Sequence, residues 1–209
     1  MDAPVRIDRA HLERCLVEVT IGGWCRIFPA RHAAAPVGAG PGDSRFATVA
    51  GGHRLLYAAE DFRTAFVETV VRDSFDDGRN PRTVDWVEIE ARVWAVLDMV
   101  GPEVRLRALD LRRDGALRLG VPTDVVGARD HAAGRVLGAA LFGGHADIDA
   151  ILFDSRLTGG AAIAVRAEAA AEKLVATVAS ELASHPDLVA TLDAYRVGIV
   201  PPAEAVRET

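Results

Sequence analysis

The pattern of apolar and polar residues changes period near residue 60. A short apolar run, Leu55-Leu56-Tyr57, follows Gly51-Gly52 and predicts a strand that ends in Ala58-Ala59. The acidic pair Glu60-Asp61 comes next, and acidic residues at a helix start can satisfy its free amides and suit its dipole. Helical spacing then puts four residues on one apolar face: Phe62, Ala65, Phe66 and Thr69. Glu68 falls beside that face, where a carboxylate can face a cleft while its helix stays packed.

Along the rest of the chain, segments with the period of a strand and segments with the period of a helix follow one another irregularly. Alternation from Val87 to Ala95 predicts one long, half-buried strand, with Trp86 and Trp94 packing over a second element. Shorter strands are predicted at 106–111, 151–154 and 161–166, and helices at 11–19, 131–142, 168–183 and 187–195. The helix at 168–183 has a predicted buried stripe of Leu174, Val175, Val178 and Leu182. Because helices and strands do not alternate regularly, the pattern favours the α+β class.

Composition sets broad limits on what the protein does. The 209 residues are 50% hydrophobic and 26% charged, which is typical of a globular chain of one sizeable domain. A net charge of −6 argues against nucleic-acid binding as the main function. Cys15 and Cys25 are too few for a disulfide framework, and neither a signal core nor a membrane-length apolar run is found. We therefore expect a soluble, cytoplasmic protein.

Several common site motifs are excluded. The six histidines lack metal-ligand spacing with Cys, Asp or Glu, so we expect no metal site. There is no G-x-S-x-G elbow and no P-loop lysine. The Gly-rich segment from 31 to 44 lacks the spacing of a dinucleotide fingerprint, and it is interpreted as a mobile loop near the site.

A set of polar residues stands at the ends of the predicted strands and on the predicted helix: Arg26, Arg45, Tyr57, Glu68, Ser155 and Arg156. Taken singly, Glu68 could be a solvated helix residue, Tyr57 a core residue and Arg45 a surface cation. Their order and spacing, with Phe46 beside Arg45 and Gly159-Gly160 after Arg156, resemble the RES domain over roughly residues 24–166. RES domains are the toxin half of a class of bacterial toxin–antitoxin pairs.

The resemblance implies both a fold and an activity. The implied fold is an ADP-ribosyltransferase-like core of two small, mostly antiparallel sheets with flanking helices and a cleft between the sheets. Domain boundaries follow: a lead-in at 1–23, a catalytic domain at 24–167 and a C-terminal helical extension at 168–209. The implied activity is cleavage of NAD at the nicotinamide–ribose bond, by hydrolysis or phosphorolysis, with NAD as substrate and no separate cofactor.

The residue types suit that chemistry. Arg26 and Arg45 can hold phosphates through bidentate guanidinium contacts, and Tyr57 can stack on the nicotinamide ring. Glu68 can stabilise the oxocarbenium-like centre that forms when nicotinamide leaves. Ser155 is expected to hydrogen-bond the ribose or carboxamide, and Arg156 to anchor phosphate or brace its loop.

The resemblance also implies a partner, an Xre-like DNA-binding antitoxin that blocks the cleft. No direct contact with nucleic acid or membrane is expected of this chain, and the C-terminal helices are either an appendage or a homo-oligomer contact. Two alternatives stay open: transfer of ADP-ribose to a protein or small-molecule acceptor, and a non-catalytic module that only binds a partner.

Overall fold

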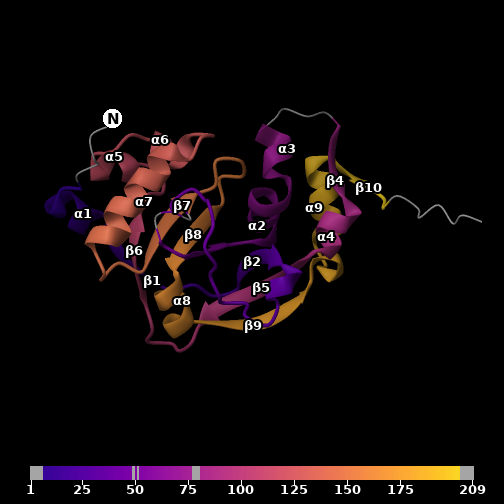
Figure 1. Cartoon of the computed structure of the whole chain (residues 1–209), viewed down its shortest axis with the longest axis horizontal. Helices are drawn as coiled ribbons and strands as arrows, with labels where there is room; N and C mark the ends of the chain where they lie inside the picture. The colour runs from indigo at the N-terminus through magenta and orange to yellow at the C-terminus, as the bar shows by residue number, and fades with distance from the viewer. Residues whose placement is uncertain (1–6, 49, 51, 77–80, 203–209) are drawn as a thin grey trace, which may run out of the picture.

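The computed structural model describes residues 7–48, 50, 52–76 and 81–202 (Figure 1). Its strands are β1 (Leu16–Val19), β2 (Trp24–Pro29), β3 (Leu55–Ala59), β4 (Arg82–Asp85), β5 (Arg92–Met99), β6 (Leu106–Asp110), β7 (Ala150–Asp154), β8 (Ala161–Arg166), β9 (Leu174–Glu181) and β10 (Val197–Val200). Its α-helices are α1 (Arg9–Cys15), α2 (Phe62–Phe66), α3 (Arg72–Asp76), α4 (Trp86–Glu90), α5 (Gly115–Leu119), α6 (Asp124–Gly127), α7 (Ala132–Gly144), α8 (Ala167–Lys173) and α9 (Leu188–Tyr195). Short 3₁₀ turns η1 (Ala30–His32) and η3 (Leu182–Ser184) and a π-helical turn η2 (Val67–Val71) complete the described elements.

Eight of these strands form one curled sheet in the order β1-β6-β7-β8-β3-β2-β5-β9. Its neighbours are antiparallel except for β6 and β7, while β4 and β10 form a separate parallel pair. The expected α+β class with a mostly antiparallel core is thus confirmed.

The sheet is nearly divided at its centre. β2 and β3 share a single residue pair, Cys25 with Ala59, whereas β3 pairs with β8 over five positions and β2 with β5 over six. The two sheets expected from the sequence are therefore halves of one sheet that diverge beyond this joint. Helix α2 follows β3 directly, so the joint and α2 lie side by side.

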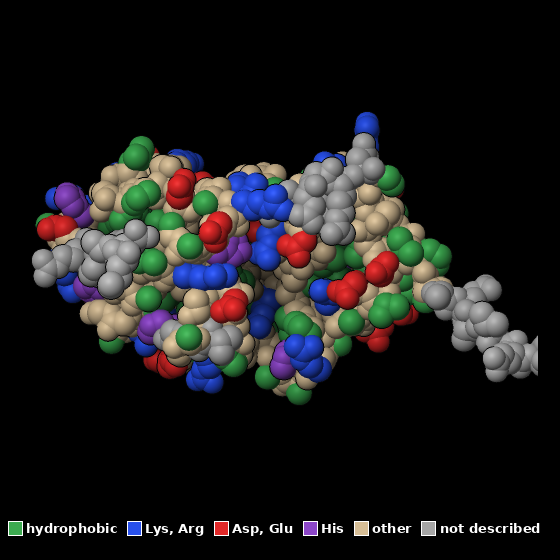
Figure 2. All heavy atoms as spheres, turned by 45° about the horizontal axis from the view of Figure 1, so that its top comes forward, with side chains coloured by type: hydrophobic (Ala, Val, Ile, Leu, Met, Phe, Trp, Pro, Cys, Tyr) green, Lys and Arg blue, Asp and Glu red, His purple; other side chains and the backbone are tan. Residues whose placement is uncertain are grey.

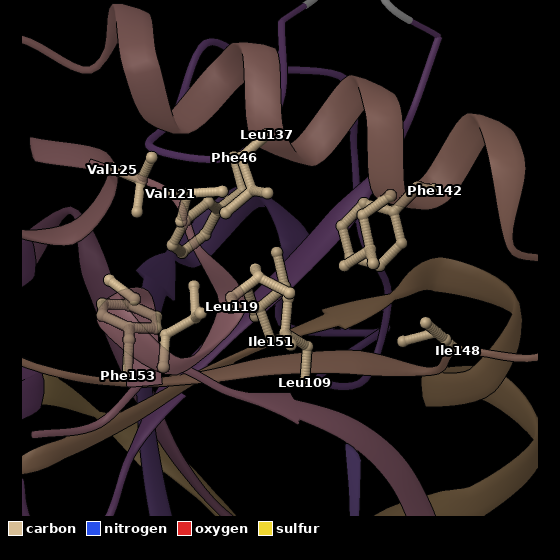
Figure 3. Close-up of a cluster of buried hydrophobic side chains, with 14 of the residues drawn as sticks. Phe46, Leu109, Leu119, Val121, Val125, Leu137, Phe142, Ile148, Ile151 and Phe153 are labelled. Carbon is tan, nitrogen blue, oxygen red and sulfur yellow. The ribbon is translucent and has the colours of Figure 1, made fainter. Parts of the chain in front are cut away.

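Helices cover the two halves separately. On the half containing β6, β7 and β8, helix α7 packs over a core that includes Phe46, Leu137, Phe142 and Phe153 (Figure 3). On the other half, α2 and α9 cover the outer side of β2. A third core, which includes Leu56, Leu97 and Leu152, lies on the opposite face of the curled sheet. Because each half of the sheet is covered by its own helices, a pocket can lie between the halves.

The predicted helix at 168–183 is wrong beyond Lys173. Helix α8 ends there, and residues 174–181 form β9, the last strand of the sheet. Of the predicted stripe, Leu174 and Leu182 are buried, but Val175 and Val178 are 39% and 43% exposed. A free edge on β5 and the β-branched residues of this segment outweigh the helical spacing. The sheet consequently crosses the predicted domain boundary at residue 167, and the expectation of a wholly helical extension is corrected.

Two other predicted elements are divided in the structure. The alternating segment at 87–95 begins as helix α4, in which Ile89 is buried and Val87 is 54% exposed, and becomes strand only from Arg92. The predicted helix at 11–19 is α1 followed by strand β1. Both segments are short, and a period cannot be assigned securely over one or two helical turns.

The remaining predictions agree with the structure to within a few residues. Strands at 55–59, 106–110, 150–154 and 161–166 are confirmed, as are helices at 132–144 and 188–195. Trp86 and Trp94 both pack against the core beneath α2 and α9, as expected. Within the described residues, no helix combines the length and apolar character needed to cross a membrane.

Candidate active site

Glu68 lies on an irregular turn of helix. Asp61 caps α2 as predicted, accepting a hydrogen bond from the Thr64 amide at 2.7 Å. After Phe66 the α-helix widens into the π-helical turn η2, which carries Glu68. Such turns are rare and frequently mark functional sites, because they reorient a side chain within a continuous helix. Glu68 is half-buried here, and Thr69, expected on the buried face, is exposed.

The Ser155 hydroxyl holds the Glu68 carboxylate. Ser155 Oγ donates to Glu68 Oε1 at 2.5 Å and accepts from the amides of Leu157 and Thr158 at 3.3 and 3.2 Å. One donated and two accepted bonds use the full capacity of a hydroxyl. Ser155 is also buried, at the end of β7. It therefore orients Glu68. Its expected contact with ribose or carboxamide stays a prediction.

Ser155 is itself held by a tight turn. The Ser155 amide donates to the Gly160 carbonyl and the Gly159 amide donates to the Ser155 carbonyl, both at 2.8 Å. Gly159 has a φ of 75°, which favours glycine. Glu60 accepts a bond from the Ala161 amide at 2.7 Å and so ties the start of α2 to the end of this turn. The two segments that carry Glu68 and Ser155 are thus joined at several points.

A pocket opens where β2 and β3 separate. Arg26 from β2, Tyr57 from β3 and Glu68 from η2 line it, and the volume open to the centres of water molecules is about 40 Å³. Its remaining walls are mostly apolar, with Ala59 and Phe153 among them. The structure therefore brings three of the six predicted site residues together in one pocket, beneath the serine-held carboxylate.

Tyr57 presents its ring to this pocket and uses its hydroxyl elsewhere. The hydroxyl lies 2.8 Å from Ser44 Oγ and accepts a bond from the Phe46 amide at 3.2 Å. Burial raises the pKa of Tyr57, so the hydroxyl stays protonated at neutral pH. These bonds fix the segment from Ser44 to Phe46, and Arg45 with it.

Arg45 is held in an interior position between helices. It is 7% exposed, and its Nη1 donates to the Ala128 carbonyl at 3.0 Å. Helix α7 approaches this segment closely: a Cβ on Gly134 would lie 2.5 Å from the Arg45 carbonyl oxygen, and one on Gly138 would lie 2.0 Å from that of Phe46. The two glycines that weaken the helical pattern of α7 are therefore required where the helix meets the site.

Arginine side chains concentrate around Arg45. Burial lowers the pKa of Arg45, the charge of Glu68 opposes that shift, and the charges of Arg156 and Arg72 add to it. We call Arg45, Arg72 and Arg156 the arginine cluster. Figure 2 shows Lys and Arg side chains gathered around a hollow across the middle of the molecule, with a histidine beside them. Such a concentration of positive charge suits an anionic ligand.

Arg26 is a second desolvated cation. Burial lowers its pKa to about 10, and its guanidinium lies 4.7 Å from the centre of the Phe28 ring. Its Nη1 donates to the Pro36 carbonyl at 2.7 Å, so the Gly-rich loop predicted near the site does reach it. A neutral carbonyl compensates a buried cation only partly, so an anionic group would bind favourably here.

Two residues of the site were not predicted. Arg72 lies four positions after Glu68, and helical spacing could have placed it on the same side. His131, next to the start of α7, has a pKa lowered to about 4 by burial and by the charges of Arg45, Arg72 and Arg135. No sequence motif marks His131, because its neighbours come from distant segments. Among the described residues no cluster of His, Cys, Asp and Glu is arranged to hold a metal ion.

Comparison with known proteins bears on the family and the fold of this chain. The family model described as RES domain matches residues 23–190, which includes β9. The probable toxin y4kH of Sinorhizobium fredii is 34% identical over 91 residues, covering 44% of this chain and 72% of that protein. A chain in the crystal structure of the M. tuberculosis MbcT–MbcA toxin–antitoxin complex superposes with a TM-score of 0.59 at 17% identity, covering 83% of this chain and 92% of that one. At that identity the superposition supports the fold alone.

Proposed function

We propose that this protein, which belongs to the RES domain family, is the toxin of a toxin–antitoxin pair and cleaves NAD at the nicotinamide–ribose bond. One observation carries the proposal: a single carboxylate, Glu68, is fixed by Ser155 at the wall of a pocket that an aromatic residue, Tyr57, and a half-buried cation, Arg26, also line. NAD supplies a matching group for each of these, namely a ribose, a cationic ring and a pyrophosphate.

The chemistry requires one carboxylate. Cleavage develops positive charge on the ribose ring, and a carboxylate fixed nearby stabilises that charge without reorganising. Nicotinamide leaves as a neutral molecule, so the leaving group needs no general acid. The bond from Ser155 holds Glu68 in one orientation before substrate arrives, which is the preorganisation that electrostatic catalysis needs.

The rest of the substrate has matching contacts. The nicotinamide ring stacks against Tyr57, which lines the pocket together with Glu68. The pyrophosphate then lies toward Arg26 or the arginine cluster, where planar guanidinium groups pair with phosphate oxygens. Phosphate contact with Arg26 would replace its bond to the Pro36 carbonyl.

A toxin of this type needs an inhibitor. Similarity to the probable toxin y4kH and to a chain of a toxin–antitoxin complex supports an antitoxin partner. We propose that the partner is a small Xre-like DNA-binding protein, which would supply the nucleic-acid surface that a chain of net charge −6 lacks. An acidic group or chain end of this partner could pair with Arg26 or Arg45 and so close the pocket. Uninhibited protein would deplete NAD in the cytoplasm.

Product analysis tests this proposal. Purified protein is incubated with NAD, with and without inorganic phosphate, and the products are identified by mass spectrometry. Free nicotinamide with ADP-ribose indicates hydrolysis, and nicotinamide with a phosphorylated ADP-ribose formed only when phosphate is present indicates phosphorolysis. Nicotinamide release that requires an added protein or small-molecule acceptor would favour ADP-ribosyl transfer. Intact NAD under all these conditions would contradict catalysis and leave the partner-binding alternative.

A further inference from the structure

Strand β9 ends the eight-stranded sheet with an unusually open edge. It is eight residues long, and none of the described residues pairs with its outer side (Figure 1). From Thr177 to Glu181 every residue is exposed. The strand contains no proline and a single charged residue, Glu181, so it lacks most of the features that keep free strand edges from pairing.

Hydrogen bonds at the two ends of β5 fix which backbone groups of β9 point outward. Ala30 donates to the Ala91 carbonyl on the β2 side, and Val100 donates to the Lys173 carbonyl on the β9 side. Backbone groups alternate sides along a strand, so the odd-numbered residues of β5 face β2 and the even-numbered ones face β9. The β9 residues opposite odd-numbered β5 residues therefore direct their amides and carbonyls away from the sheet. These residues are Leu174, Ala176, Ala179 and Glu181. The Leu174 amide is already bonded to the Ala170 carbonyl of α8, so at that position only the carbonyl is open.

A β-bulge makes this outward set symmetric. Ala176 pairs with Leu97 and Val178 with Val96, which leaves Thr177 as an extra residue in β9. The outward residues are consequently spaced by two, three and two positions, a pattern that is the same in both chain directions. A bulge usually disturbs edge pairing. Here the symmetric spacing lets two antiparallel copies of β9 face each other with their outward residues in register.

We propose that two copies of this chain associate through β9 to form a continuous sheet across a twofold axis. The axis passes between Thr177 and Val178, so that Leu174 of one copy pairs with Glu181 of the other and Ala176 with Ala179. With their symmetry mates these make four pairs. Each Ala176–Ala179 pair exchanges two hydrogen bonds, and each Leu174–Glu181 pair adds one, from the Glu181 amide to the Leu174 carbonyl. Antiparallel pairing puts the two Glu181 carboxylates at opposite ends of the interface, so like charges do not meet. A twofold contact of this kind is closed and gives a dimer.

The other free edge of the sheet is a poorer partner. Strand β1 has four residues, and the bond from the Asp149 amide to the Arg107 carbonyl shows that Arg107 faces β7. Because Leu106 and Ala108 then face β1, only Leu16 and Glu18 have outward backbone groups. Pairing of β9 with β1 would leave half of the outward groups of β9 unmatched and would build an open chain of copies.

The test compares proline substitutions on the two edges. Proline at position 179 removes an outward amide and spares the bonds between β9 and β5, because edge strands tolerate proline on their solvent side. Ala179→Pro should weaken dimerisation by roughly tenfold or more, since each copy loses a hydrogen bond to the other. Glu18→Pro, which removes an outward amide of β1, is the matched control and should leave the dimer intact. Analytical ultracentrifugation over a range of concentrations measures both variants against the monomer mass of 22.2 kDa.

Amide hydrogen exchange of the unaltered chain provides a second measurement that does not depend on a variant's folding. The amides of Ala176, Ala179 and Glu181 should become protected as protein concentration rises through the dimerisation range. A chain that stays monomeric at all concentrations would overturn the proposal. So would a dimer whose β9 amides exchange freely, or one that a folded Ala179→Pro variant leaves unchanged.

Discussion

The hydroxyl of Ser155 donates a 2.5 Å hydrogen bond to the carboxylate of Glu68, across 87 positions of sequence. Both groups are constrained by their own segments, Ser155 by the turn that follows β7 and Glu68 by the π-helical turn after α2. This contact joins the two segments and fixes the orientation of the carboxylate in the pocket. The effects of this contact on catalysis and on substrate binding can be measured separately.

Replacing Glu68 with Gln should abolish NAD consumption with little change in melting temperature. The amide keeps the volume of the side chain but lacks the negative charge that stabilises the ribose cation. Activity is followed by nicotinamide release, and stability by thermal unfolding. Cells that express this variant should grow without the antitoxin, whereas cells that express the unaltered chain should grow only when the antitoxin is co-expressed. An active Glu68→Gln protein would remove Glu68 from the mechanism.

Replacing Ser155 with Ala should reduce kcat more than it changes KM. Loss of the orienting bond lets the carboxylate move, and displacement of a catalytic group by about 1 Å can lower the rate by roughly 100-fold. The amides of Leu157 and Thr158 also lose an acceptor, so stability should fall by about 1 kcal/mol. Ser180→Ala, at an exposed serine, is the control. Weaker binding of an NAD analogue at unchanged kcat would indicate instead that Ser155 contacts substrate.

Replacing Arg26 or Arg45 with Lys should weaken binding of an NAD analogue by roughly 1–3 kcal/mol, because an ammonium cannot reproduce two parallel bonds to phosphate. Calorimetric titration measures the affinity of each variant. Arg14→Lys, on the exposed side of α1, is the control for a general charge effect. If neither Arg26→Lys nor Arg45→Lys changes affinity, the phosphates are held elsewhere, and Arg156 is the next candidate.

Replacing Gly138 with Ala should destabilise the protein by about 1–3 kcal/mol, the usual cost of overpacking a core. The new methyl group would lie 2.0 Å from the Phe46 carbonyl oxygen, so α7 must move away from the segment that holds Arg45. Gly144→Ala in the same helix is the control, since a Cβ there meets nothing within 4 Å. Denaturant unfolding compares the two. Equal stability of both variants would mean that α7 does not constrain this segment.

His131 should make stability depend on pH in the acid range. Its pKa is about 4 in the folded protein and ordinarily 6.5, so between these values the unfolded chain binds more protons than the folded one. Stability should therefore fall as the pH is lowered from about 6.5 toward 4. His131→Gln should flatten this part of the curve of unfolding free energy against pH. His32→Gln, at an exposed histidine, is the control.

The local character of most elements was determined by sequence alone. The period of Phe62, Ala65 and Phe66, the cap at Asp61 and the apolar runs of β7 and β8 each depend on neighbouring residues, so a sequence pattern suffices to predict them. The candidate residues Arg26, Tyr57, Glu68 and Ser155 were predicted by their resemblance to RES domains. The structure places Arg26, Tyr57 and Glu68 along one pocket and Ser155 against Glu68, while their roles toward a substrate stay predictions.

Tertiary structure decided the features that depend on partners distant in the chain. Residues 174–181 form a strand because β5 offers an open edge, although their spacing also fits a helix. Ser155 orients Glu68 because folding brings this carboxylate, 87 residues away in sequence, to a hydroxyl that two amides of the following turn already hold. The positions of Arg72 and His131 beside Arg45 likewise follow from packing. Sequence specifies which groups are present, but their pairing and their electrostatic surroundings arise only when distant segments fold against one another.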